Sequence, residues 1–286
     1  MAAANESRVL RFFGVEPAEV EQAAAGLAGR CGLAHVESRA QGAETLLALT
    51  APPRALHRAG ERLRRAFAGG LYGAGGDTLA DCTAQALVGR DRLLACADPE
   101  ALALLASRLE GRPGISRVFD FGAGSCLDAA LMAKVDARVS RAPAQDPLAD
   151  KLCRMQAAVH LTHADLVAGV LARDGDTLVL LARRKGCWVC SVPPEGSPAL
   201  WLLDMIRRAA KRLPQAKGVR YCRAGRAHGA ARRWRTRLLL ALLLAAAVGL
   251  VLALQATGGD LSALPQLLRS LAGASQPPAH SGAIFL

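Results

Sequence analysis

The chain has 286 residues, enough for two modest domains. Apolar residues make up 52% of it and aromatic residues only 4%, a composition that favours helix-containing α/β packing and argues against an all-β sandwich. The net charge of +12 would suggest a nucleic-acid-binding body, but eight Lys and Arg side chains and no acid lie in residues 217–237, so the remaining charge is nearly balanced.

The first part of the chain, residues 8–76, predicts a small α/β domain with the order strand, helix, strand, strand, helix. Its expected elements are a strand over 8–14, a helix over 16–29, strands over 33–38 and 45–50, and a helix over 53–68. The glycine-rich run 73–76 lacks the lysine of a phosphate-binding loop, so it predicts a linker. Asp77 or Thr78 is then expected to cap the next helix.

A second α/β unit is expected over residues 77–216. Its predicted helices are 79–87, a segment ending at 109, 129–133, 148–160 and 198–213; its predicted strands are 93–97, 115–121, 166–171, 177–182 and 187–192. The turn Arg173-Asp174-Gly175-Asp176 between two apolar runs is a hairpin signal.

Eight scattered cysteines without a framework spacing indicate reduced thiols. Cys187 and Cys190 form a CxxC pair, but in a strand residues i and i+3 point to opposite faces of the sheet, so the pair does not predict a metal site. His160 and His163 lack a third ligand at a suitable spacing and are expected to cap a helix or lie on the surface. We expect neither a metal nor a cofactor.

Residues 238–256 contain the long apolar run LLLALLLAAAVGLVLAL, which predicts a single transmembrane helix because it lacks the polar stripe of a core helix. The preceding basic juxtamembrane segment, 217–237, ends in an expected interfacial anchor formed by Arg232, Arg233, Trp234, Arg235 and Arg237. Basic flanks stay on the cytoplasmic side, so the body is expected inside the cell membrane and the tail 257–286 outside. Anionic lipid headgroups are the expected partners of 217–237, in preference to nucleic acid.

Several segments resemble the competence/damage-inducible (CinA) family. RVLRFFG at Arg8–Gly14, and LYG at 71–73 followed by DTL at 77–79, resemble its middle domain. SRLEGRPGISRVF at Ser107–Phe119 resembles its C-terminal nicotinamide-nucleotide amidase module. The resemblance implies a three-layer α/β/α amidase-like domain after the small domain, and self-association as a homodimer.

The chain departs from the family's catalytic pattern. The family's nucleophilic serine falls on Pro99 and the acid before it on Asp98, while the following glycines fall on Leu102 and Ala103. The family's Tyr-Ser-Asn…Lys segment falls on Cys126, Leu127, Asp128 and Leu131; Ser125 and Lys134 are the remaining candidates for a nucleophile and a base. The resemblance therefore implies a frame that has lost its reaction, with weak or absent nucleotide binding.

Three hypotheses remain open from the sequence. The favoured one is a membrane-anchored pseudoenzyme of the amidase fold that acts as a binding or scaffold module. The second is an active C–N hydrolase that deamidates nicotinamide mononucleotide, and the third is a membrane-tethered, nucleic-acid-associated competence factor.

Overall fold

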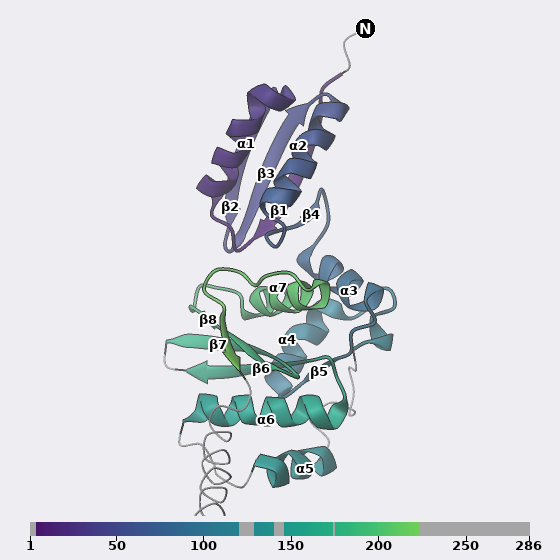
Figure 1. The fold of residues 1–286 in the computed structure, drawn as a ribbon, viewed down its shortest axis with the longest axis vertical. Coiled ribbons are helices and arrows are strands. Elements are labelled where there is room, and N and C mark those ends of the chain that lie inside the picture. Colours follow the sequence, from purple (N-terminus) through teal and green to yellow (C-terminus); the bar gives the residue numbers. More distant parts are fainter. Residues whose placement is uncertain (1–3, 120–128, 140–145, 174, 224–286) are drawn as a thin grey trace, which may run out of the picture. The chain divides into compact units, whose positions relative to one another are not determined.

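A computed structural model describes residues 4–119, 129–139, 146–173 and 175–223. These residues form a mixed α/β fold with seven α-helices and two sheets (Figure 1), which confirms the α/β class. By its contacts the chain divides at residue 224, and the described residues lie in the unit Met1–Ala224.

The first sheet is antiparallel, with the strand order β2-β3-β1-β4. Its strands are β1 (Glu6–Phe13), β2 (His35–Gln41), β3 (Glu44–Ala51) and β4 (Leu71–Ala74). Helices α1 (Pro17–Cys31) and α2 (Pro53–Ala66) share an apolar core with it: Val20 and Leu63 from the helices are buried with Leu47 and Leu49 of β3. The order strand, helix, strand, strand, helix is the predicted one.

The second sheet has the order β5-β6-β7-β8-β9, in which only β5 and β6 are parallel. Its strands are β5 (Leu94–Cys96), β6 (Leu166–Arg173), β7 (Asp176–Arg183), β8 (Gly186–Val192) and β9 (Arg220–Arg223). One core cluster joins the sheet to α3 (Leu79–Gly89), α4 (Pro99–Leu109) and α7 (Pro198–Lys211). The other joins it to α5 (Ala129–Val139) and α6 (Pro147–Thr162).

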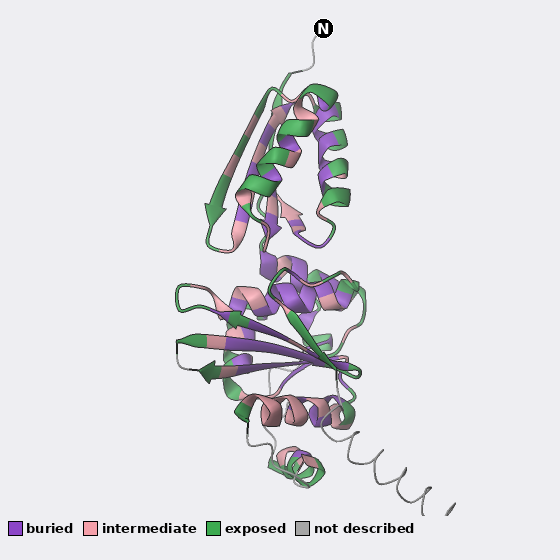
Figure 2. Cartoon of the chain, turned by 60° about the vertical axis from the view of Figure 1, so that its left-hand side comes forward, coloured by how far each residue is buried: buried purple, intermediate pink, exposed green. Residues whose placement is uncertain are grey.

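The alternation of side chains along β8 separates the two cores. Cys187 is buried in the cluster with α6, whereas Cys190 is buried in the cluster with α7, so the CxxC pair does lie on opposite faces of the sheet. Figure 2 shows buried residues concentrated in the strands of the second sheet and in α7. The predicted hairpin is also confirmed, because Arg173 pairs with Asp176 at the end of the β6–β7 ladder.

A buried charged cluster on α7 ties this helix to the first part of the chain. The Asp204 carboxylate accepts hydrogen bonds from Arg207 and Arg208, whose exposed fractions are only 1% and 4%. Arg207 also donates to the carbonyl oxygen of Gly69 at 2.6 Å, and Arg208 to that of Phe13 at 2.9 Å. The guanidinium groups thus satisfy the carbonyl at the end of β1 and one in the turn between α2 and β4.

Two predictions made from the sequence are wrong in detail. Of the strand expected over 115–121, the structure describes residues 115–119. These form a short 3-10 helix (Ile115–Arg117), and Phe119 makes a single bridge to Leu94. Ile115, Val118 and Phe119 are all buried, and this spacing of three and four residues is helical rather than alternating.

The expected linker 73–76 begins inside a strand, because Gly73 and Ala74 belong to β4. A side chain at Gly73 would place its Cβ 2.7 Å from that of Asp77, so the glycine lets the chain fold back. Asp77 then accepts a hydrogen bond from the Ala74 amide at 2.9 Å. Of the two predicted caps, Asp77 and Thr78, Thr78 occupies the position and forms a capping box with Asp81.

The start of the basic segment is folded. Residues 220–223 form the edge strand β9, and Lys217 pairs with Glu19 at 2.5 Å. In the described part of the chain, no helix is both long and apolar enough to cross a bilayer. The predicted transmembrane helix (238–256), its anchor residues and the tail all lie outside the described residues.

Candidate functional site

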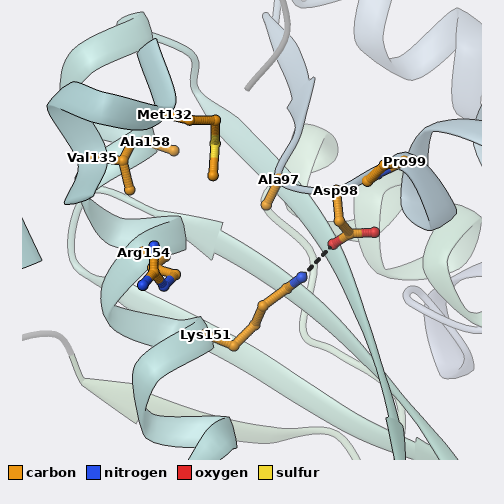
Figure 3. Close-up of a pocket in the computed structure, with 8 residues that line it drawn as sticks. All are labelled: Ala97, Asp98, Pro99, Met132, Val135, Lys151, Arg154 and Ala158. Carbon is orange, nitrogen blue, oxygen red and sulfur yellow. Dashed lines mark ion pairs between the residues drawn. The ribbon is translucent and has the colours of Figure 1, made fainter. Parts of the chain in front are cut away.

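The clearest candidate site is a cavity of about 390 Å³ beside the turn between β5 and α4, which we call the Asp98 cavity. It is lined by Ala97, Asp98, Pro99, Met132, Val135, Lys151, Arg154 and Ala158 (Figure 3). The cavity lies at the carboxyl end of β5, the edge at which ligands bind in open α/β sheets.

The turn that forms one wall is built by hydrogen bonds to a single carboxylate. Asp98 has an extended backbone and caps α4: its Oδ1 accepts the Ala101 amide at 2.7 Å. Its Oδ2 accepts the Val170 amide of β6 at 3.0 Å. Pro99 follows as the first residue of the helix, a position where its missing amide hydrogen costs nothing.

Lys151 completes the environment of this carboxylate. It projects from α6 and places its Nζ 2.8 Å from Asp98 Oδ2, with exposed fractions of 19% for the lysine and 13% for the aspartate side chain. Figure 3 shows the ammonium group pointing across the cavity at Asp98. Among the described residues, Asp98 thus receives two backbone hydrogen bonds and one ion pair.

Gly169 makes room for this arrangement on β6. A Cβ at residue 169 would lie 2.8 Å from Met155 Sδ and 3.3 Å from Asp98 Oδ2. The absence of a side chain at residue 169 therefore leaves room for the carboxylate to approach the strand and accept the Val170 amide.

The remaining wall carries a second positive charge and apolar groups. Arg154, one turn beyond Lys151 on α6, pairs with Asp150 at 2.6 Å and with Asp136 of α5. The hydrogen bonds that Arg154 donates to Asp150 and Asp136 raise the pKa of its guanidinium group. Met132 and Val135 of α5 contribute the apolar surface.

The described lining offers little for covalent chemistry. It contains no hydroxyl, thiol or imidazole side chain, and its one carboxylate and nearest ammonium group are bonded to each other. A nucleophile needs a reactive group with a positioned base. The described residues of this cavity can bind and orient a molecule, but they present no such pair.

The structure brings some predicted site residues together and separates others. Asp98 and Pro99 line the cavity, whereas Leu131 is half-buried against the α6 core cluster and Lys134 is exposed on α5, outside the lining. Leu102 packs against the α7 core cluster and does not reach the cavity. Ser125 and Cys126 lie outside the described residues.

Sequence reasoning missed Lys151 and Arg154. They stand three residues apart on the same face of α6, but so do many solvated pairs of basic residues. Asp150 before them supplies a helical ion pair and gives no sign of a cavity.

The described residues contain no cluster of three or more His, Cys, Asp or Glu side chains that could hold a metal ion. Comparison with known proteins leaves the family open: no family model matches the chain, and no curated protein matches it either.

Proposed function

We propose that the protein is a membrane-anchored binding module built on the frame of the nicotinamide-nucleotide amidases of the CinA family, without their reaction. The observation that carries the proposal is the turn at Asp98 and Pro99. By resemblance, Pro99 occupies the position of the nucleophile, and proline has no group that can attack a carbonyl carbon.

The hydrogen bonds around Asp98 support a structural role for the former catalytic turn. The carboxylate caps α4, joins it to β6 and pairs with Lys151, so each of its oxygens is engaged. A cavity with one such neutralised pair, a paired arginine and an apolar wall suits reversible binding of a small molecule. The resemblance also implies weak or absent nucleotide binding, since the glycine positions of the family carry Leu102 and Ala103, although Leu102 does not reach the cavity in this chain.

The activity is tested with the full chain in mild detergent. Incubation with nicotinamide mononucleotide is expected to release no more ammonia than buffer alone. The control is Lys151→Met, which removes the cavity's amine. A Ser125→Ala variant removes the remaining candidate nucleophile. Ammonia release by the natural chain that disappears in Lys151→Met or in Ser125→Ala would establish the amidohydrolase and end the proposal, whereas equal release by all three proteins would indicate a contaminant.

The membrane attachment rests on the apolar run 238–254 and its basic flank. We expect the full chain to sediment with membranes after an alkaline carbonate wash and a chain ending at residue 223 to stay in the supernatant. Cys222 is exposed, so it also reports orientation. With the body inside the cell, an impermeant maleimide should label Cys222 only after permeabilisation, while a Ser275→Cys tail is labelled on intact cells.

A further inference from the structure

A second cavity, of about 630 Å³, lies at the opposite end of β5 from the Asp98 cavity, and we call it the basic pocket. Its lining comes from the residues before β5 and β6, the β7–β8 turn and the carboxyl ends of α6 and α7. Five of its side chains are basic: Arg92, Arg183, Arg184, Lys185 and Arg212.

Only a small part of this positive charge is neutralised by the described residues. Asp165 is the one carboxylate in the lining, and it pairs with Arg92 at 2.6 Å and accepts the Leu93 amide at 3.1 Å. The other four basic side chains have no ion pair with a described residue.

The alternative to a ligand site is that these basic side chains only offset the partial negative charge at the carboxyl ends of the helices. His163 and Arg212 do occupy the C-cap positions of α6 and α7. Each helix end carries about half a negative charge, so two ends and Asp165 offset about two of the five positive charges. About three remain without a counter-charge among the described residues.

The backbone is left-handed at the two helix ends that line the pocket. His163 and Arg212 have φ angles of 57° and 58°, in the left-handed region that glycine adopts most readily. Both residues are helix C-caps, positions at which the left-handed conformation commonly ends a helix.

The aromatic pair beside the pocket holds one of its arginines. The Arg183 guanidinium lies 4.7 Å from the centre of the Trp188 ring and 5.8 Å from that of Tyr221, which belongs to β9. Stacking of this kind leaves the edge of the guanidinium available for hydrogen bonds.

We propose that the basic pocket binds a phosphate group. Four of its five cations are arginines, whose planar guanidinium groups match the oxygens of a phosphate in a bidentate manner. The phosphate belongs either to a soluble compound or to a lipid headgroup. The position of the pocket supports the lipid source. Arg223 pairs with Gly186, next to Lys185, and the chain continues from Arg223 into the remaining basic segment.

This site is separate from the Asp98 cavity, and its test does not depend on the absence of amidase activity. The full chain in zwitterionic detergent is titrated with inorganic pyrophosphate by calorimetry. Arg184→Gln/Lys185→Gln removes two charges from the exposed β7–β8 turn; Arg58→Gln/Arg62→Gln removes two exposed charges from α2 as the matched control. Circular dichroism verifies that both variants keep their secondary structure, and Arg212→Gln serves as a second variant of the pocket.

The lipid source is tested in nanodiscs. Hydrogen exchange of residues 183–186 is compared between discs of phosphatidylcholine alone and discs containing phosphatidylglycerol. Protection that appears only with the anionic lipid and is lost in Arg184→Gln/Lys185→Gln identifies a headgroup site.

In the calorimetric titration, we expect pyrophosphate binding to be at least tenfold weaker in the pocket variants and to change less than twofold in the α2 control. In nanodiscs, we expect the protection of residues 183–186 by anionic lipid to be lost in Arg184→Gln/Lys185→Gln. Pyrophosphate binding alone indicates a soluble phosphate compound, nanodisc protection alone indicates lipid, and either result supports the proposal. The proposal is overturned when neither is observed, or when the α2 variant weakens binding as much as the pocket variants.

Discussion

Replacing Asp98 with Asn should destabilise the protein far more than the same change at another helix cap. The remaining carbonyl oxygen of Asn can still accept the Ala101 amide, because Asn and Asp are equally good caps. The NH2 group of Asn, however, would face two other donors, the Val170 amide and the Lys151 ammonium group, which now interact with Oδ2. Losing a hydrogen bond to a charged acceptor costs about 1.5 kcal/mol. Losing the ion pair costs about 1 kcal/mol. The total is about 2.5 kcal/mol.

Asp146→Asn is the matched control. Asp146 caps α6 through the Leu148 amide, is exposed, and has no ion pair with a described residue. Its replacement should cost no more than about 0.5 kcal/mol, a figure that includes the lost charge at a helix start. Both variants of the full chain are unfolded in urea in the presence of mild detergent and followed by tryptophan fluorescence. Equal losses of unfolding free energy at the two caps would refute the role assigned to Val170 and Lys151.

Three further predictions follow from buried groups. Asp204→Asn should cost about 3–5 kcal/mol of unfolding free energy, since it leaves two buried guanidinium groups without their carboxylate; a loss below 1 kcal/mol would contradict this. Gly169→Ala should cost about 1–3 kcal/mol through overpacking, and less in a Met155→Ala background; an unchanged cost would argue against the predicted contact. Burial raises the pKa of the Cys187 thiol to about 11, so at pH 8 it stays protonated. Iodoacetamide should therefore modify the exposed Cys222 long before Cys187, as followed by peptide mass spectrometry, and equal rates would contradict the burial of Cys187.

Local signals in the sequence predicted the elements that local chemistry determines. The hairpin at Arg173–Asp176 follows from its turn residues, and the cap at Thr78 from its place before an apolar helix. The 3-10 turn at Ile115 was misassigned because a short apolar run after a Pro-Gly turn looks the same for a strand and for a helical turn.

The candidate site was only half predictable for a different reason. Asp98 and Pro99 were located because the strand-to-helix turn is a local feature. Lys151 stands far along the chain on another helix, and only tertiary packing brings its ammonium group to Asp98. The sequence likewise predicts residues 220–223 as part of a basic flank, because an edge strand of Arg, Tyr, Cys and Arg has no apolar alternation to reveal it.

The short strand β9 also determines how a pull on the rest of the chain would reach the body. It joins the sheet along one side only, through β8, and the chain continues from the end at which Arg223 faces Gly186. Tension applied beyond residue 223 is therefore borne first by this outermost pair. Peeling of β9 would separate Tyr221 from Trp188, whose ring centres are 5.7 Å apart, and would leave the other four strands paired. The edge strand can thus detach under tension before the rest of the sheet unfolds, and a change in the fluorescence of Trp188 would report the detachment.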